Sequence, residues 1–189
     1  MPSSSPLQIS QLVEMIRAAK PRSVLDIGIG FGKYGFLCRE YLELWDGRDQ
    51  YNDWQRRIDG IEAFEGYITP LHKLIYSNIY VGNALDIVPA LATHYDLVLM
   101  VDVIEHFTLK DGLNLLQACA QRARACIIST PLEVTSQQSA FGNEFERHRS
   151  RWSAETLFDY PQKIIVPSPQ AMLCYIRFDG VRLSTAGKP

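Results

Sequence analysis

The sequence predicts an α/β fold: a doubly wound, mostly parallel sheet of seven strands with an antiparallel edge. Apolar runs of strand length alternate with segments of helical periodicity along the chain, a pattern typical of parallel sheets covered by helices. Residues 95–101 are continuously apolar after Asp96, as expected of a central strand that is buried on both faces. Pro167, Ser168 and Pro169 separate the last two apolar runs, which indicates that these two strands form the antiparallel edge.

Each element follows from its periodicity and from the residues that begin or end it. A first helix is expected over 7–20, with Ser10 as a candidate N-cap and Pro21 just past its end. Pro131 is expected to end the fifth strand, and Ser153 to cap a last helix. The other helices are expected over 33–44, 67–76, 84–92 and 111–124, and the strands from Ser23 to the glycines that follow and over 58–64, 79–82, 95–101, 125–129, 163–166 and 172–178.

Length and composition predict one globular domain, 1–189, because 189 residues with 47% hydrophobic content suffice for a core. A net charge of −2 means that basic residues are not in excess, so nucleic acid is not an expected partner. The four cysteines contain no Cys-x-x-Cys pair and fit buried free thiols. No apolar run reaches the roughly 18 residues of a membrane span. The first residues lack the basic and then apolar pattern of a secretion signal. A soluble cytoplasmic protein is therefore expected.

The first candidate site follows the first strand, where Asp26 precedes three glycines at alternate positions, Gly28, Gly30 and Gly32. Glycines let backbone and ligand approach closely because no Cβ intervenes. A strand, a tight loop and a helix in succession form the arrangement that receives nucleotide-like ligands. A carboxylate beside the loop opposes a pyrophosphate by charge repulsion and favours a ligand that carries an amine.

Residues 24–32 resemble the first motif, Val-Leu-Asp-x-Gly-x-Gly-x-Gly, of the class I S-adenosylmethionine-dependent methyltransferases, which have a Rossmann-like fold. S-adenosylmethionine (SAM) carries a sulfonium and an ammonium group and no phosphate. The resemblance implies SAM as cofactor, S-adenosylhomocysteine (SAH) as product, and Asp26 with the glycine loop as the site of the amino-acid end. The alternative is the dinucleotide pattern Gly-x-Gly-x-x-Gly at Gly30, Gly32 and Gly35, which begins later after the strand than in a dinucleotide fold.

Two further strand ends are expected at the cofactor. In the family, an acid at the end of the second strand binds both ribose hydroxyls, and here Glu62 stands before Ala63. The alternative is that Glu62 is a solvated strand-end acid. Many family members bind the adenine amino group with Gly-Asp-Ala, where this chain has Asn83 and Ala84. The amide oxygen of Asn83 is expected to accept the same hydrogen bond, with Asp86 as a second candidate.

Residues 101–106 resemble the Asp-Val-Ile/Leu-Glu-His segment of small-molecule methyltransferases. In that family the segment lines the methionine end of the cofactor and faces the acceptor. The resemblance implies that Asp102 orients the cofactor amine or the acceptor and that His106 acts as a general base. The alternative is that Glu105 and His106 only fix the loop by hydrogen bonding.

The segment 132–152 is expected to be a substrate-side loop, because related methyltransferases carry a His followed by Trp-Ser there. His148 and Trp152 are therefore acceptor-site candidates, the alternative being a solvated loop with Trp152 anchored in the core. His72 and His94 are expected to be ordinary surface or helix-end residues. No metal is expected, since no compact His and carboxylate cluster of ligand spacing stands out.

These motifs together imply a single-domain SAM-dependent methyltransferase that acts on an O, N or C nucleophile of a small molecule. Two other classes stay open. An NAD-dependent oxidoreductase would use the glycines from Gly30 to Gly35. A non-catalytic cofactor-binding or assembly module would keep the loop without an acceptor site, and the part of the insertion 45–57 from Trp45 to Trp54 would then be a partner surface.

Overall fold

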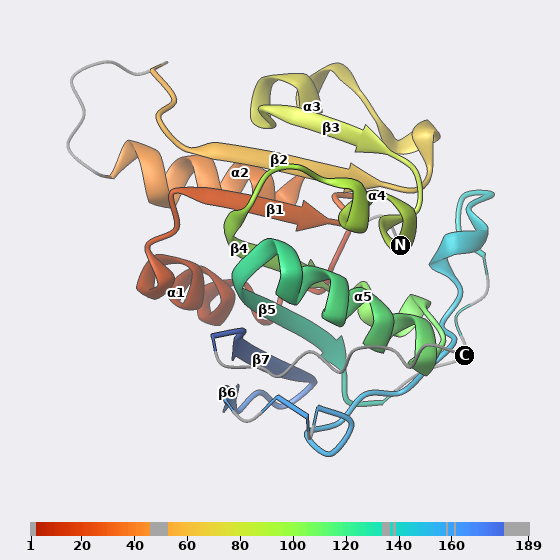
Figure 1. The fold of residues 1–189 in the computed structure, drawn as a ribbon. Coiled ribbons are helices and arrows are strands. Elements are labelled where there is room, and N and C mark those ends of the chain that lie inside the picture. Colours follow the sequence, from red (N-terminus) through yellow and green to blue (C-terminus); the bar gives the residue numbers. More distant parts are fainter. Residues whose placement is uncertain are drawn as a thin grey trace.

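The computed structural model describes residues 3–45, 53–133, 137, 139–157, 159–160 and 162–179. Seven strands form one sheet in the order β3-β2-β1-β4-β5-β7-β6 (Figure 1). The first five are parallel, and β7 runs antiparallel to both of its neighbours. The predicted sheet is thus confirmed, including its antiparallel edge. The strands are β1 (Ser23–Ile27), β2 (Arg57–Glu62), β3 (Asn78–Val81), β4 (Tyr95–Val101), β5 (Ala123–Pro131), β6 (Lys163–Val166) and β7 (Ala171–Arg177).

Helices cover both faces of the sheet, as the alternating pattern predicts (Figure 1). In β4, Leu97 and Leu99 belong to one apolar cluster, and Val98 and Met100 to the other, because successive side chains of a strand point to opposite faces. None of the described helices is long and apolar enough to cross a membrane. One face packs against α1 (Ile9–Ala19), α2 (Lys33–Arg39) and α3 (Pro70–Ile75), and the other against α4 (Ala84–Ala90) and α5 (Leu109–Arg122).

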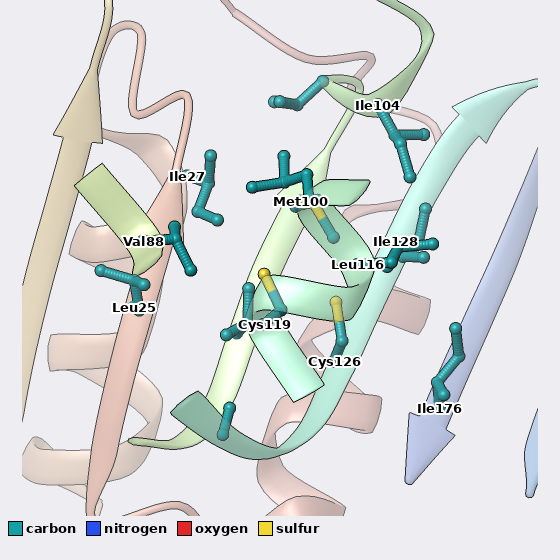
Figure 2. Close-up of a cluster of buried hydrophobic side chains, with 14 of the residues drawn as sticks. Leu25, Ile27, Val88, Met100, Ile104, Leu116, Cys119, Cys126, Ile128 and Ile176 are labelled. Carbon is teal, nitrogen blue, oxygen red and sulfur yellow. The ribbon is translucent and has the colours of Figure 1, made fainter. Parts of the chain in front are cut away.

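Figure 2 shows part of the core beneath α4 and α5, which includes Val88 of α4, Leu116 of α5 and Met100 of β4. All three side chains are buried, and each stabilises the fold by roughly 1.5–3 kcal/mol through removal of apolar surface from water. Cys119 of α5 and Cys126 of β5 lie in the same cluster. All four cysteines are buried and free, which confirms the prediction of buried thiols.

Several element ends differ from the predicted ones. The N-cap of α1 is Gln8, and Ser10 lies inside the helix. The helix predicted over 33–44 changes after Arg39 into the π-helical segment η1 (Glu40–Leu44). The strand β5 runs through Pro131, which is its last paired residue and does end it.

The helix predicted to begin at Ser153 is wrong: residues 154–157 form turns. The hydroxyl of Thr156 accepts a hydrogen bond from the Ser153 N–H at 3.1 Å and donates one to the Ser153 carbonyl at 2.7 Å. Such local side-chain bonds offer the backbone an alternative to a helical ladder.

The insertion 45–57 is anchored by a buried ion pair at its beginning. Arg39 donates to Glu43 at 2.6 Å, and Glu43 in turn accepts from the backbone N–H groups of Gln55 and Arg56. These bonds close the connection between η1 and β2. Residues 46–52 lie outside the described residues, so most of the hypothesised partner surface does as well.

Candidate functional site

A cavity opens at the carboxyl ends of the parallel strands, the edge at which open α/β sheets bind ligands. The loops that follow β1, β2, β3 and β4 all contribute to its wall, as do Ser3 and Ser4 and the segment that contains Asn143 and Arg149. Nine of the residues predicted for the site line this cavity: Asp26, Gly28, Gly30, Glu62, Ala63, Asn83, Ala84, Asp102 and His106.

The glycine loop between β1 and α2 adopts left-handed backbone conformations, with φ of 74° at Gly28 and 90° at Gly32. A Cβ atom on Gly28 would lie 2.5 Å from Cγ2 of Val103, so the loops after β1 and β4 approach closely there. Gly32 does not line the cavity. It forms the N-cap of α2 and adjoins His72, which places it behind the loop.

His72 supports the glycine loop from behind, which corrects the expectation that it is an ordinary surface or helix-end residue. It is only 1% exposed. Its Nδ1 accepts from the Thr69 N–H at 3.1 Å, so Nε2 carries the proton and donates to the Gly30 carbonyl at 2.8 Å. The sequence contains one signal for this arrangement, the helix start Thr69-Pro70.

Asp26 lines the cavity and is 3% exposed. The hydroxyl of Tyr76 donates to its Oδ2 at 2.7 Å. Burial raises the pKa of Asp26 to about 7, opposed by this hydrogen bond and assisted by the charge of Glu62. A cationic group in the cavity would favour the ionised carboxylate by charge attraction.

Glu62 is 5% exposed, which excludes the alternative of a solvated strand-end acid. One carboxylate oxygen accepts from the Gly30 N–H and the other from the Phe64 N–H, both at 3.0 Å. Burial raises the pKa of Glu62, and these two hydrogen bonds lower it. Each oxygen still has a second lone pair, so the carboxylate is held in place and remains able to accept from two ligand hydroxyls.

Asn83 lines the cavity and also caps α4, because its Oδ1 accepts from the Leu85 N–H at 3.0 Å. The cap uses one lone pair of the oxygen that was expected to bind the adenine amino group. The side-chain amide also offers two N–H donors to a ligand. Asp86, the second candidate, lies in the first turn of α4, where an acid stabilises the helix dipole.

Asp102 is held by two elements at once in a left-handed backbone conformation, with φ of 54°. Its Oδ1 accepts from the Ser129 hydroxyl at 2.8 Å, and its Oδ2 from the Ser5 N–H at 2.9 Å. The ammonium group of Lys33 donates to the Ser4 carbonyl. The N-terminal segment therefore covers this side of the cavity, a placement for which the Ser/Pro-rich sequence gives no signal.

His106 lines the cavity at the end of the short 3₁₀ helix η3 (Ile104–His106). Its Nδ1 lies 3.3 Å from the Arg147 carbonyl, which can only accept, so Nδ1 carries the proton. Burial lowers the pKa of His106, and this hydrogen bond raises it. The Nε2 atom therefore keeps its lone pair, as a general base or a metal ligand requires.

His148 and Trp152 were predicted together but lie in different surroundings. The ring of His148 is 5.0 Å from that of His106, centroid to centroid. Trp152 is 1% exposed and packs in the core against Gly112, so the alternative of a core anchor holds and the acceptor-site prediction for Trp152 is wrong. Its indole N–H donates to the Ser150 hydroxyl at 2.8 Å.

No compact cluster of His and carboxylate stands out in the sequence, but the fold brings one together. Glu105, His106 and His148 each offer one ligand atom, and these atoms lie within 4.8 Å of one another. The cluster has no sequence signature, because the loop that carries His148 reaches η3 only through the fold.

No family model matches the chain, and no curated protein is significantly similar to it in sequence. Solved structures nevertheless share its fold. The N-terminal domain of EvdMO1 with SAH bound is 13% identical and aligns over 92% of this chain and 82% of that chain, with a TM-score of 0.66. A SAM-dependent methyltransferase from Archaeoglobus fulgidus is 18% identical over 89% of this chain and 91% of that chain, with a TM-score of 0.65.

An O-methyltransferase family protein from Burkholderia thailandensis is 14% identical over 90% of this chain, with a TM-score of 0.63. The match covers 56% of that protein, so the present chain spans little more than half of its length. At these identities the likeness concerns the fold. The α/β architecture of this chain is shared with these three solved structures, among them a SAM-dependent methyltransferase and a domain with SAH bound.

Proposed function

We propose that this chain is a SAM-dependent methyltransferase that acts on a small-molecule acceptor. The observation that carries the proposal is the buried carboxylate of Glu62, which is fixed by two backbone N–H groups and lines the same cavity as Asp26 and the glycine loop. Neighbouring hydroxyls of a ribose need two oriented acceptors, and a carboxylate at a strand end supplies them.

The other cavity residues suit the remaining parts of the cofactor. Asp26 and the glycine loop would hold the cationic amino-acid end, because an ionised carboxylate attracts an ammonium group. Ala63 and Ala84 leave room beside the adenine, and Asn83 offers it amide donors and an acceptor lone pair. The bound cofactor supplies a methyl group activated by the sulfonium.

The residues near η3 would act on the acceptor. His106 keeps a lone pair on Nε2 and lines the cavity, so it can take a proton from an O or N nucleophile of the acceptor. Asp102 would hold the cavity wall in place on this side, because its carboxylate accepts from both the Ser129 hydroxyl and the Ser5 N–H. Alignment of the acceptor with the methyl group contributes much of the acceleration in such a transfer.

The dinucleotide alternative is less well supported by the geometry. Five acidic side chains line the cavity, among them Asp26 and Glu62, and a pyrophosphate would meet negative charge there. Gly35, the last glycine of the dinucleotide pattern, has a packing explanation: a Cβ atom there would lie 2.3 Å from Cζ of Tyr76.

Calorimetric titration of the full chain with SAH, beside an equal titration with NAD, tests the proposal. We expect micromolar affinity for SAH and no heat with NAD. Binding of NAD alone, or of neither compound, would overturn the proposed function. Turnover of SAM with a panel of hydroxyl, amine and carbon acceptors then separates an enzyme from a cofactor-binding module.

A further inference from the structure

We propose that Glu105, His106 and His148 bind a divalent transition-metal ion beside the cavity. Their ligand atoms lie within 4.8 Å of one another. Two imidazoles and one carboxylate form a donor set that suits divalent iron, cobalt, nickel and zinc better than magnesium or calcium, which prefer oxygen ligands alone.

Glu105 is the strongest observation in favour of an ion. Its side chain is 1% exposed, and both carboxylate oxygens are buried without a hydrogen-bond partner in the described part of the chain. A buried carboxylate without a partner is costly, whereas coordination of one of its oxygens to a cation would balance its charge.

His106 is already oriented as a metal ligand. Its Nδ1–H donates to the Arg147 carbonyl, which leaves Nε2 unprotonated. Ligating histidines almost always donate their other ring N–H to a carbonyl or carboxylate, which fixes the tautomer and the orientation of the ring.

The backbone brings His148 to the cluster. The carbonyl of Glu105 accepts from the N–H groups of Arg149 and Ser150 at 2.8 and 3.1 Å, and the His148 N–H donates to Gln137 at 3.2 Å. The first two bonds attach the substrate-side loop to η3 directly after His148, and the third joins His148 to Gln137 within the same loop. The two imidazole rings are consequently 5.0 Å apart, centroid to centroid.

Three protein ligands leave positions open on the ion, as in catalytic metal sites. Because His106 lines the cavity, an oxygen of the acceptor can occupy such a position. This consequence rests on the proposed function and identifies the acceptor as a hydroxyl compound. Its oxygen would form the O–C bond while the S–C bond breaks towards sulfur and the hydroxyl proton leaves to solvent. His106 would then serve as a ligand in place of a base.

The test is a titration of the untagged, chelator-treated full chain with Co²⁺, followed by visible absorption, and with Zn²⁺, followed by calorimetry. Neither titration contains SAM or SAH. We expect one ion per chain and a d–d spectrum of a low-coordinate nitrogen and oxygen site. The Glu105→Gln and His148→Gln variants should bind the metal ion more weakly than the unmodified chain. The loss should exceed roughly 10- to 100-fold, which is the loss typical of removing a residue that only hydrogen-bonds to a metal ligand.

His94→Gln is the matched control, because it removes an exposed imidazole and should leave the affinity unchanged. Absence of stoichiometric Co²⁺ binding by the unmodified chain would overturn the proposal, whatever the variants do. Equal affinity in the unmodified chain, Glu105→Gln and His148→Gln would also overturn it. Binding of the metal without binding of SAH would refute the proposed function alone, and the reverse result would refute the metal site alone.

Discussion

Glu62 joins the loops after β1 and β2 through a single carboxylate, and this double role makes its replacement informative. In Glu62→Gln, one of the two backbone donors, the N–H of Gly30 or of Phe64, would meet an amide NH₂ group. We expect SAH affinity to fall by roughly 1.5–3 kcal/mol, or about 10- to 100-fold, since charge-assisted hydrogen bonds are lost. Glu65→Gln, at an exposed position three residues later, is the calorimetric control. Unchanged SAH affinity in Glu62→Gln would show that Glu62 does not bind the ribose.

Replacing Asp26 should have opposite effects on the stability of the fold and on the affinity for SAH. Its pKa of about 7 in the fold lies above the value of 3.8 for an unperturbed Asp, so its contribution to stability is complete below pH 3.8 and is lost as the pH rises through 7. Asp26→Asn should therefore raise the free energy of unfolding at pH 8 and hardly change it at pH 3.5, as measured by urea denaturation.

The same substitution should weaken SAH binding at pH 8, where the native carboxylate is ionised, by about tenfold. In the unmodified chain, SAH affinity should rise between pH 5.5 and 8, and Asp26→Asn should lose most of that rise. A pH-independent affinity in the unmodified chain would contradict a contact between Asp26 and the ligand ammonium group.

The sequence could predict that these two acids line one cavity, because their positions depend on local spacing near strand ends. Asp26 is the last but one residue of β1 and Glu62 the last of β2, and parallel strands bring their ends to one edge. The role of His72 was unpredictable, because its bond to the Gly30 carbonyl depends on how α3 packs against the loop. The proximity of Glu105 to His148 likewise depends on a contact between segments far apart in the chain.

Among the elements, the loop after β1 and the substrate-side loop each contain a glycine with the same φ angle. Gly28 and Gly142 both have φ of 74°, but a Cβ atom would meet Val103 at 2.5 Å in the first case and nothing within 4 Å in the second. Both alanine variants bear the left-handed strain of roughly 1–2 kcal/mol. Gly28→Ala should lose about 1–3 kcal/mol more, because the clash is with a stiff β-branched side chain. Equal losses in urea denaturation would show that the two loops can separate.

Helix α5 allows a test in which two effects have opposite signs. Alanine is favoured over glycine in a helix by about 1 kcal/mol, but a Cβ atom on Gly112 would lie 2.3 Å from Cζ2 of the buried Trp152. Because overpacking costs about 1–3 kcal/mol, Gly112→Ala should be destabilising. Asn114→Ala, at an exposed position of the same helix, should be slightly stabilising. If both variants gain stability, Trp152 is less firmly anchored than its hydrogen bond to Ser150 indicates.

Strands were predicted better than helix ends for a physical reason. A strand such as β4 is buried on both faces, so its whole length is apolar and visible in the sequence. Helix ends depend on a few local hydrogen bonds. At Ser153, the hydroxyl of Thr156 takes the backbone groups that would begin a helix, and composition alone does not distinguish this turn from an N-cap.

At the scale of the whole molecule, the cavity is the place where most segments meet. Loops from four parallel strands, the N-terminal Ser3 and Ser4, and the substrate-side loop all line it. The convergence of the strand ends follows from the parallel sheet and could be predicted. The arrival of the N-terminal segment on Asp102 could not, because a backbone N–H such as that of Ser5 leaves no trace in the sequence.

A ligand in this cavity would therefore stabilise the whole chain at once. At a concentration 100 times its Kd, SAH should add about 2.7 kcal/mol to the free energy of unfolding. For a chain of 189 residues this corresponds to a rise in Tm of roughly 5–10 °C, given about 2–4 °C per kcal/mol. Thermal unfolding with equal concentrations of SAH and NAD should show the rise with SAH alone. In Glu62→Gln the rise at the same concentration should shrink, because the Kd is larger. A rise of the same size in that variant would mean that SAH stabilises the chain from a site other than this cavity.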